Sequence, residues 1–169
     1  KVNVDAAIKE DRKIAGLGVV IKNHRGQVLA AVVKSIIPGE RSYTEAHAVK
    51  WGMEVVKDLS LSSAIIETDC KIVVDLANKK VSNMTEIWWT MSDIHKSTQD
   101  FQLISFQHVP RKCNGFAHFL AKRALCSSES VIWRNNFPAD VLCMAESLFN
   151  ERFTFFSKKK KKSLSLNQI

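Results

Sequence analysis

The chain has 169 residues, of which 46% are hydrophobic and 25% are charged, a composition typical of one globular domain with a full core. Its longest apolar runs are too short to span a bilayer, so we expect no membrane partner. The formal net charge is +8, but five positive charges lie in the run Lys158–Lys162, without which the balance is +3. The rest of the chain is therefore mildly basic, which weakly favours a partner that carries phosphates.

The two ends of the chain say little about targeting. The sequence starts at Lys1, directly in a strand-like pattern and without an initiator Met, so we expect a fragment of a longer protein. The run Lys158–Lys162 is typical first of a solvated tail and second of a nuclear-import signal or a nonspecific nucleic-acid contact. The compartment stays open at this point, with the nucleus as one candidate.

The cysteines show neither CxxC nor zinc-finger spacing, and each lies in or beside an apolar pattern. They are Cys70, Cys113, Cys126 and Cys143. We expect small buried residues of an intracellular reducing compartment rather than disulfides or zinc ligands.

The N-terminal part of the chain has the alternation of three strands joined by short turns, with Val2 and Val4 apolar between polar neighbours. Gly16 and Gly18 lie inside the second strand and no helix follows them, so they do not indicate a nucleotide-binding loop. The predicted strands cover residues 1–8, 14–23, 27–34, 62–68 and 102–109.

Apolar residues at helical spacing predict four helices between or after these strands, over residues 38–59, 69–80, 84–98 and 114–124. Ser42 begins a Ser-Tyr-Thr-Glu pattern, which predicts a capping box closed by Glu45. Asn114 is the expected cap of the last helix. The resulting order βββαβααβα predicts an α/β fold, with a five-stranded mixed sheet and helices on both faces.

The predicted elements divide the chain into three parts. Residues 1–128 form the predicted domain, and residues 129–157 form a C-terminal extension that we expect to pack on it. A short helix is expected in this extension after Pro138. Residues 158–169 form the basic tail, which we interpret as disordered.

Three acids occupy comparable places in this pattern. Asp5 lies in the first strand, Glu45 in the first turn of the first helix, and Asp69 where an apolar strand ends and a helix begins. Each has an ordinary interpretation, as a residue of a solvated strand face or as part of a helix cap. Alternatively, carboxylates that converge at strand ends hold a divalent cation such as Mg²⁺, because they repel one another without one.

Five stretches carry a family resemblance as a set: KVNVDAA, AGLGVVIKNHRGQVLAA, TEAHAVKWGM, IIETDCKIVV and HVPRKCNGFAHFLAKRA. Over about residues 1–128 the chain resembles the plant branch of the ribonuclease H-like family, a domain often attached to retroelement reverse transcriptases. The resemblance implies a ribonuclease H-like fold and a metal-dependent endonuclease that hydrolyses the RNA strand of an RNA–DNA hybrid. It implies that Asp5, Glu45 and Asp69 are catalytic acids and bind two Mg²⁺ or Mn²⁺ ions.

Two histidines fall in the remaining catalytic positions of the family pattern. His118 stands where the family motif has an Asp, so the resemblance implies a catalytic and metal-binding role for an imidazole. At the start of a helix we expect this ring to be neutral and to offer a nitrogen lone pair, which suits Mn²⁺ better than Mg²⁺. His108 matches the family's proton-shuttling His by its spacing, and it has an equal interpretation as a strand-end residue without a chemical role.

Candidate contacts to the nucleic acid are Lys71, Asn114, Arg111 and Lys112, for which solvated surface is the alternative. The implied partner is an RNA–DNA hybrid, bound by a monomeric domain. Two functions therefore compete: a hybrid endonuclease, and a catalytically weak or inactive, domesticated nucleic-acid-binding domain whose signature is His118. A zinc hydrolase is a distant third, since the sequence has no tight His/Cys cluster.

Overall fold

The computed structural model describes residues 1–79, 86–126 and 130–147. The chain forms two compact units, Lys1–Asn135 and Asn136–Ile169, and each is described by itself. In the second unit, residues 139–147 are helical, as Pro138 and the apolar spacing after it predict. The run Lys158–Lys162 and the rest of the predicted tail lie outside the described residues, and the packing on the domain of the part of the extension after Asn135 stays a prediction.

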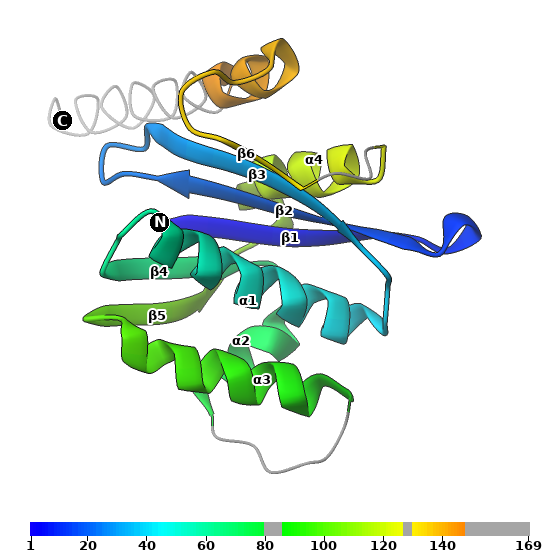
Figure 1. Ribbon diagram of the computed structural model, residues 1–169, viewed down its shortest axis with the longest axis vertical. Helices are drawn as coiled ribbons and strands as arrows, with labels where there is room; N and C mark the ends of the chain where they lie inside the picture. Colours follow the sequence, from blue (N-terminus) through cyan, green and yellow to red (C-terminus); the bar gives the residue numbers. More distant parts are fainter. Residues whose placement is uncertain (80–85, 127–129, 148–169) are drawn as a thin grey trace, which may run out of the picture. The chain divides into compact units, whose positions relative to one another are not determined.

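The first unit is built on one mixed sheet (Figure 1) with the strand order β5-β4-β1-β2-β3-β6. Its strands are β1 (Val2–Lys9), β2 (Ile14–Lys22), β3 (Val28–Ile36), β4 (Ser63–Thr68), β5 (Leu103–His108) and β6 (Val131–Trp133). β1, β2, β3 and β6 pair antiparallel, whereas β1, β4 and β5 pair parallel. The parallel pairs require the crossover helices that the sequence predicts between these strands.

The predicted number of five strands is wrong, because β6 adds a sixth at the edge beside β3. The residues of β6 belong to the C-terminal extension that the sequence pattern predicts. Only three residues of β6 pair with β3, too few to produce a recognisable alternation. A strand this short forms because a long neighbour offers unpaired backbone groups to it.

The predicted helices are all present in the described residues. They are α1 (Arg41–Asp58), α2 (Lys71–Asn78), α3 (Glu86–Ser97) and α4 (Gly115–Ala124), with short 3₁₀ turns η1 (Glu10–Arg12), η2 (Thr98–Asp100) and η3 (Arg111–Cys113). None of the helices in the described part of the chain is both long and apolar enough to cross a membrane.

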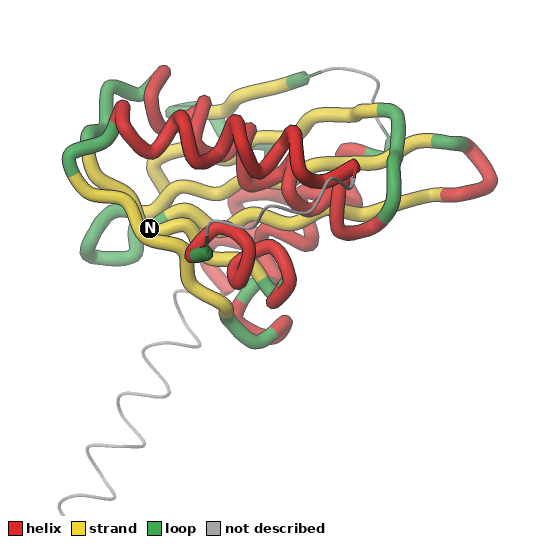
Figure 2. The backbone as a smooth tube through the Cα atoms, turned by 90° about the horizontal axis from the view of Figure 1, so that it is seen from below, coloured by secondary structure: helices red, strands yellow, loops and turns green. Residues whose placement is uncertain are grey.

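Helices cover both faces of the sheet, as predicted (Figure 2). Alternate residues such as Val2 and Val4 share one core with α1, α2 and α3. On the opposite face, α4 lies so close to β2 that a Cβ added to Gly16 would stand 2.1 Å from the carbonyl oxygen of Ala121. The strand glycines therefore serve close helix packing. Asp5 pairs with Gly18 across the sheet and consequently lies on the α4 face.

The predicted capping box at Ser42 is wrong. Helix α1 begins at Arg41, after Glu40, and no side chain caps it. Instead the hydroxyl of Thr44 donates to the carbonyl oxygen of Glu40 at 3.0 Å. Because the helix starts two residues earlier than a Ser42 cap would place it, Glu45 is turned toward the interior rather than back toward the helix start.

The cysteines are free thiols, as predicted, but the expected burial is wrong. Cys70 is half-buried, and Cys113, Cys126 and Cys143 are exposed. Cys113 and Cys126 lie at or beyond the end of a regular element, and Cys143 lies on the exposed side of the helix over residues 139–147, so an apolar neighbourhood in sequence does not imply a core position.

Candidate active site

The site forms where β1 and β4 separate. Their parallel ladder covers only Val2 with Ile66 and Asn3 with Glu67. Beyond this point β1 continues to Lys9, paired with β2 alone, while β4 ends at Thr68. The backbone groups of β1 that would face β4 are therefore open to side chains, and the predicted acids meet there.

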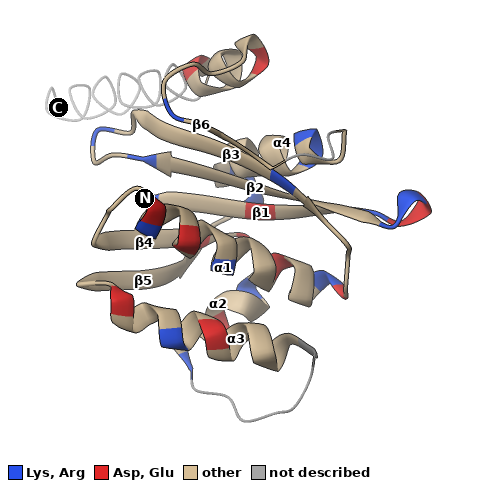
Figure 3. Ribbon diagram, viewed as in Figure 1, with Lys and Arg blue, Asp and Glu red and all other residues tan. Residues whose placement is uncertain are grey.

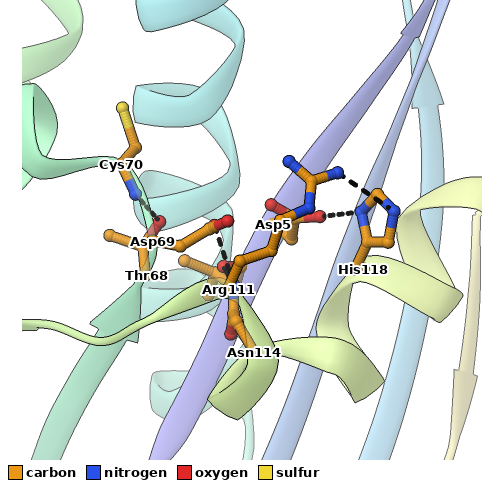
Figure 4. Close-up of polar contacts among 8 residues, drawn as sticks. Asp5, Thr68, Asp69, Cys70, Arg111, Asn114 and His118 are labelled. Atoms are coloured by element: carbon orange, nitrogen blue, oxygen red, sulfur yellow. Dashed lines mark hydrogen bonds and ion pairs between the residues drawn. The ribbon is translucent and has the colours of Figure 1, made fainter.

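Asn114 takes the place of a strand neighbour at this opening. It is 1% exposed, and its Nδ2 donates to the carbonyl oxygen of Val4 at 2.9 Å and to Oδ1 of Asp69 at 3.2 Å (Figure 4). Asn114 stands at the N-cap position of α4, as predicted, but its side chain does not cap that helix. One amide thus ties the last helix to β1 and orients an acid that follows β4.

Asp69 is not a helix cap. Helix α2 has Cys70 at its N-cap position, without a side-chain capping bond, and the backbone N–H of Cys70 donates to Oγ1 of Thr68 at 3.2 Å. The Asp69 carboxylate is close enough to Asp5 that its charge raises the pKa of Asp5. Of the two interpretations open in the sequence, the structure therefore favours an acid held for a site.

The surroundings of Glu45 disfavour the ionised form of its carboxyl group. It is 4% exposed, and its pKa is raised to about 8, first by burial and then by the charges of Asp5 and Asp69. The backbone N–H of Ala6 and the Arg41 guanidinium oppose this rise only partly. Its Oε2 is buried without any hydrogen-bond partner, which is the arrangement that a cation would relieve.

Asp5 is also deeply buried, at 3% exposure. Burial raises its pKa to about 6, and the nearby Asp69 adds to the rise, while a hydrogen bond from His118 opposes it. That bond joins Nδ1 of His118 to Oδ2 of Asp5 at 2.7 Å. The other ring nitrogen, Nε2, lies 3.2 Å from Nη2 of Arg111 (Figure 4). Both nitrogens of His118 are therefore engaged, which the sequence did not predict.

These residues fit a divalent metal site by their chemistry. Three carboxylates supply hard oxygen ligands, the type that Mg²⁺ and Mn²⁺ take, and Oε2 of Glu45 is buried without a hydrogen-bond partner in the described structure. Among the described residues, no group of three or more His, Cys, Asp or Glu side chains is already arranged to hold an ion.

Two grooves adjoin the acids, and Glu40, Arg41 and Glu45 line both. One, of about 640 Å³, also contains Asp69, Cys70 and Lys71. The other, of about 650 Å³, is lined by His118, Arg111, Lys13 and Lys122 among others.

The second groove has basic side chains together with Glu10 and Glu40, and Figure 3 shows basic positions on α4 and both basic and acidic positions at the turn between β1 and β2. Arg41 is a residue that the sequence analysis missed. Its signal was its position four residues before Glu45, which places both on one helix face.

The remaining candidate residues, Lys71, Lys112 and His108, form no hydrogen bond or ion pair with the three acids in the described part of the chain. Lys71 is exposed at the start of α2, and Lys112 is exposed in η3. His108 is exposed at the end of β5, opposite Thr68. In the described part of the chain, no hydrogen bond or ion pair joins His108 to the three acids, so its proton-transfer role stays a prediction.

The sheet and its crossover helices form a ribonuclease H-like fold. A family model described as reverse transcriptase-like matches residues 3–124, and the chain belongs to this family. No sequence among the curated proteins matches it.

Solved structures share the fold at identities below 25%. RNase H1 from the halophilic archaeon Halobacterium salinarum NRC-1 matches with a TM-score of 0.69 and 22% identity, over 74% of this chain and 96% of that one. The N-terminal RNase H domain of Rv2228c from Mycobacterium tuberculosis matches at 0.66 and 23%, over 75% and 94%. LC11-RNase H1, solved in complex with an RNA/DNA hybrid, matches at 0.67 and 20%, over 74% and 95%.

Proposed function

We propose that this chain is a metal-dependent endonuclease that hydrolyses the RNA strand of RNA–DNA hybrids. The observation that carries the proposal is the convergence of Asp5, Glu45 and Asp69 at the β1–β4 opening, with a buried carboxylate oxygen that has no partner. The structural relative LC11-RNase H1 binds an RNA/DNA hybrid, which supports the same substrate class here.

In this proposal the three acids hold two divalent ions, which supply Lewis-acid activation of water and stabilisation of the leaving 3′ oxygen when bound. Asn114 holds Asp69 in place, and His118 holds Asp5. His118 as a nitrogen ligand stays a prediction that its contacts do not support, because both ring nitrogens are already engaged.

In this proposal the protein contacts the phosphates of the hybrid and also the 2′-hydroxyl of the cut strand, the group by which RNA differs from DNA. Lys71 stands in the groove beside Asp69, and Arg111 in the groove beside His118. Lys112 and the Asn114 amide are further candidates, and His108 is proposed to transfer a proton to the leaving oxygen.

A second function is favoured by one observation. Where the family motif has a fourth carboxylate, this chain has His118, which forms a hydrogen bond to Asp5 instead of adding a charge to the site. A site with three acids binds metal more weakly than one with four. The alternative is therefore a hybrid-binding domain with weak or no cleavage.

The two functions are separated by incubating a labelled RNA–DNA hybrid with the protein and Mg²⁺ or Mn²⁺, and resolving the products on a gel. We expect internal cuts in the RNA strand only, none in DNA or RNA duplexes, and none in EDTA. Asp69→Asn is the control against a contaminating nuclease. Binding of the hybrid without cuts under either ion would support the binding-domain alternative.

A further inference from the structure

His118 is held between a cation and an acid. Its Nδ1 lies 2.7 Å from Oδ2 of Asp5, and its Nε2 lies 3.2 Å from Nη2 of Arg111. The Asp5 carboxylate is almost fully buried, whereas Arg111 is exposed. The imidazole therefore connects the groove surface to the interior of the site.

The chemistry of the three groups fixes the direction of these bonds. A guanidinium has only donors, so Arg111 donates and Nε2 of His118 accepts. An imidazole that accepts at Nε2 carries its N–H at Nδ1, and a carboxylate oxygen accepts that hydrogen. Arg111 consequently donates to His118, and His118 donates to Asp5.

The local backbone makes this arrangement rigid. Arg111 begins η3, and the N–H of Asn114 donates to the carbonyl oxygen of Arg111 at 3.0 Å. The N–H of His118 in turn donates to the carbonyl oxygen of Asn114 at 3.0 Å. One continuous segment, residues 111–118, thus presents Asn114 to Asp69 and His118 to Asp5.

We propose that Arg111 is a positioning residue, which holds His118 in the Nδ1–H tautomer so that the imidazole orients Asp5 as a hydrogen-bond donor instead of binding metal through a nitrogen. In its consequence for metal binding, the proposal rests on the proposed function. Groups that orient a ligand from behind change metal affinity or activity by roughly 10- to 100-fold when they are removed.

The tautomer is tested on the metal-free full chain by ¹⁵N correlation spectra of the imidazoles, in which a His118→Asn sample assigns the His118 signals among the five histidines. We expect the proton at Nδ1 in the parent and a shift toward Nε2–H in Arg111→Met. Lys112→Met, which removes a charge from the same 3₁₀ turn, should leave the spectrum unchanged. A proton at Nε2 in the parent, or an unchanged spectrum in Arg111→Met, overturns the proposal.

The consequence for the site is tested by titrating the same proteins with Mn²⁺. An Asn amide nitrogen reaches the position of Nδ1 and a Gln amide nitrogen that of Nε2, so His118→Asn should bind Mn²⁺ about 10-fold more tightly than His118→Gln. Arg111→Met should bind Mn²⁺ about 10-fold more weakly than the parent. Tighter binding by Arg111→Met, which frees Nε2, would mean that His118 is a ligand and would overturn the proposal.

Failure of the proposed function gives a different pattern. If the parent itself binds no Mn²⁺ while its spectrum has the expected tautomer and responds to Arg111→Met, the metal-dependent nuclease is wrong and the positioning of His118 by Arg111 stands.

Discussion

Two buried acids near β1 show how differently one sheet treats a carboxylate. Glu67, on β4 where the ladder to β1 is intact, is 7% exposed and accepts hydrogen bonds from Lys1 and from Nδ2 of Asn3, the latter at 2.9 Å. Glu45, at the opening where the two strands have separated, is 4% exposed and has Asp5 and Asp69 as charged neighbours. One of its oxygens has no partner at all.

The difference separates a structural acid from a site acid. A buried carboxylate that is paired and hydrogen-bonded costs little, whereas a buried carboxylate among other acids is costly until a cation arrives. The two regions therefore have different roles. Glu67 stabilises the pairing of β1 with β4, whereas Glu45 lies where a cation would offset the repulsion between carboxylates. Four predictions follow this contrast.

The largest effect is expected for Asp69→Asn, which removes a charge from the opening while keeping the size of the side chain. Cleavage of the hybrid should fall at least about 100-fold, because a ligand of the proposed ions is lost. Affinity for the hybrid should stay equal or increase, since the repulsion of phosphate is smaller. Gel cleavage rates and binding isotherms in EDTA measure the two quantities, and cleavage at the parent's rate would contradict the metal role of Asp69.

Metal binding should stabilise the protein through Glu45, where β1 and β4 have separated, and not through Glu67, where the two strands are paired. At a Mn²⁺ or Mg²⁺ concentration about 100 times the Kd, the free energy of unfolding should rise by about 2.7 kcal/mol, which raises Tm by roughly 5–10 °C. Glu45→Gln should reduce this rise, whereas Glu67→Gln should retain it. Thermal unfolding with and without metal measures the effect, and an equal loss in both variants would break the contrast.

The pH dependence of the metal-free protein should come from the opening. A carboxyl whose pKa is raised by folding stabilises the fold fully below its unfolded pKa, and this contribution is lost as the pH rises through the folded pKa. For Glu45 the window runs from 4.5 to about 8. In EDTA, Glu45→Gln should therefore unfold roughly 2–4 °C above the parent at pH 9, for about 1 kcal/mol, and close to the parent at pH 4. A constant difference across this range would show that Glu45 does not titrate in it.

The smallest effect is expected for Glu67→Gln, which should lower Tm where Glu45→Gln raises it. Glu67→Gln removes the charge that Lys1 and Asn3 share, so the variant should be less stable than the parent by about 1 kcal/mol or less, since Lys1 is half-exposed. This corresponds to a Tm lower by roughly 2–4 °C at neutral pH. A Tm above that of the parent would place Glu67 in the same class as Glu45.

Local patterns were sufficient for the elements but not for their boundaries. The period-2 runs predicted β1 to β5, and the helical stripes predicted α1 to α4, because these long amphipathic segments have one way to bury their apolar residues. Ser42 misled the assignment of the start of α1, because the helix has Glu40 at its N-cap position, two residues earlier. The strand β6 forms because β3 lies beside it, and the exposure of three cysteines likewise depends on which distant segments lie near them. A local sequence pattern does not predict such neighbours.

The amino-acid sequence by itself determined which acids and histidines are candidates, since Asp5, Glu45, Asp69 and His118 each break an apolar or motif pattern. Only the tertiary structure decided what they do to one another. The separation of β1 from β4 brings the three acids together, raises the pKa of Glu45 and Asp5 by burial, and turns Asn114 from a helix cap into a link between Val4 and Asp69. The tertiary structure also brings Asp5 to Nδ1 of His118 and Arg111 to its Nε2. The physical reason is that burial and electrostatic repulsion depend on distances between residues far apart in the chain, and such distances exist only after the sheet has formed.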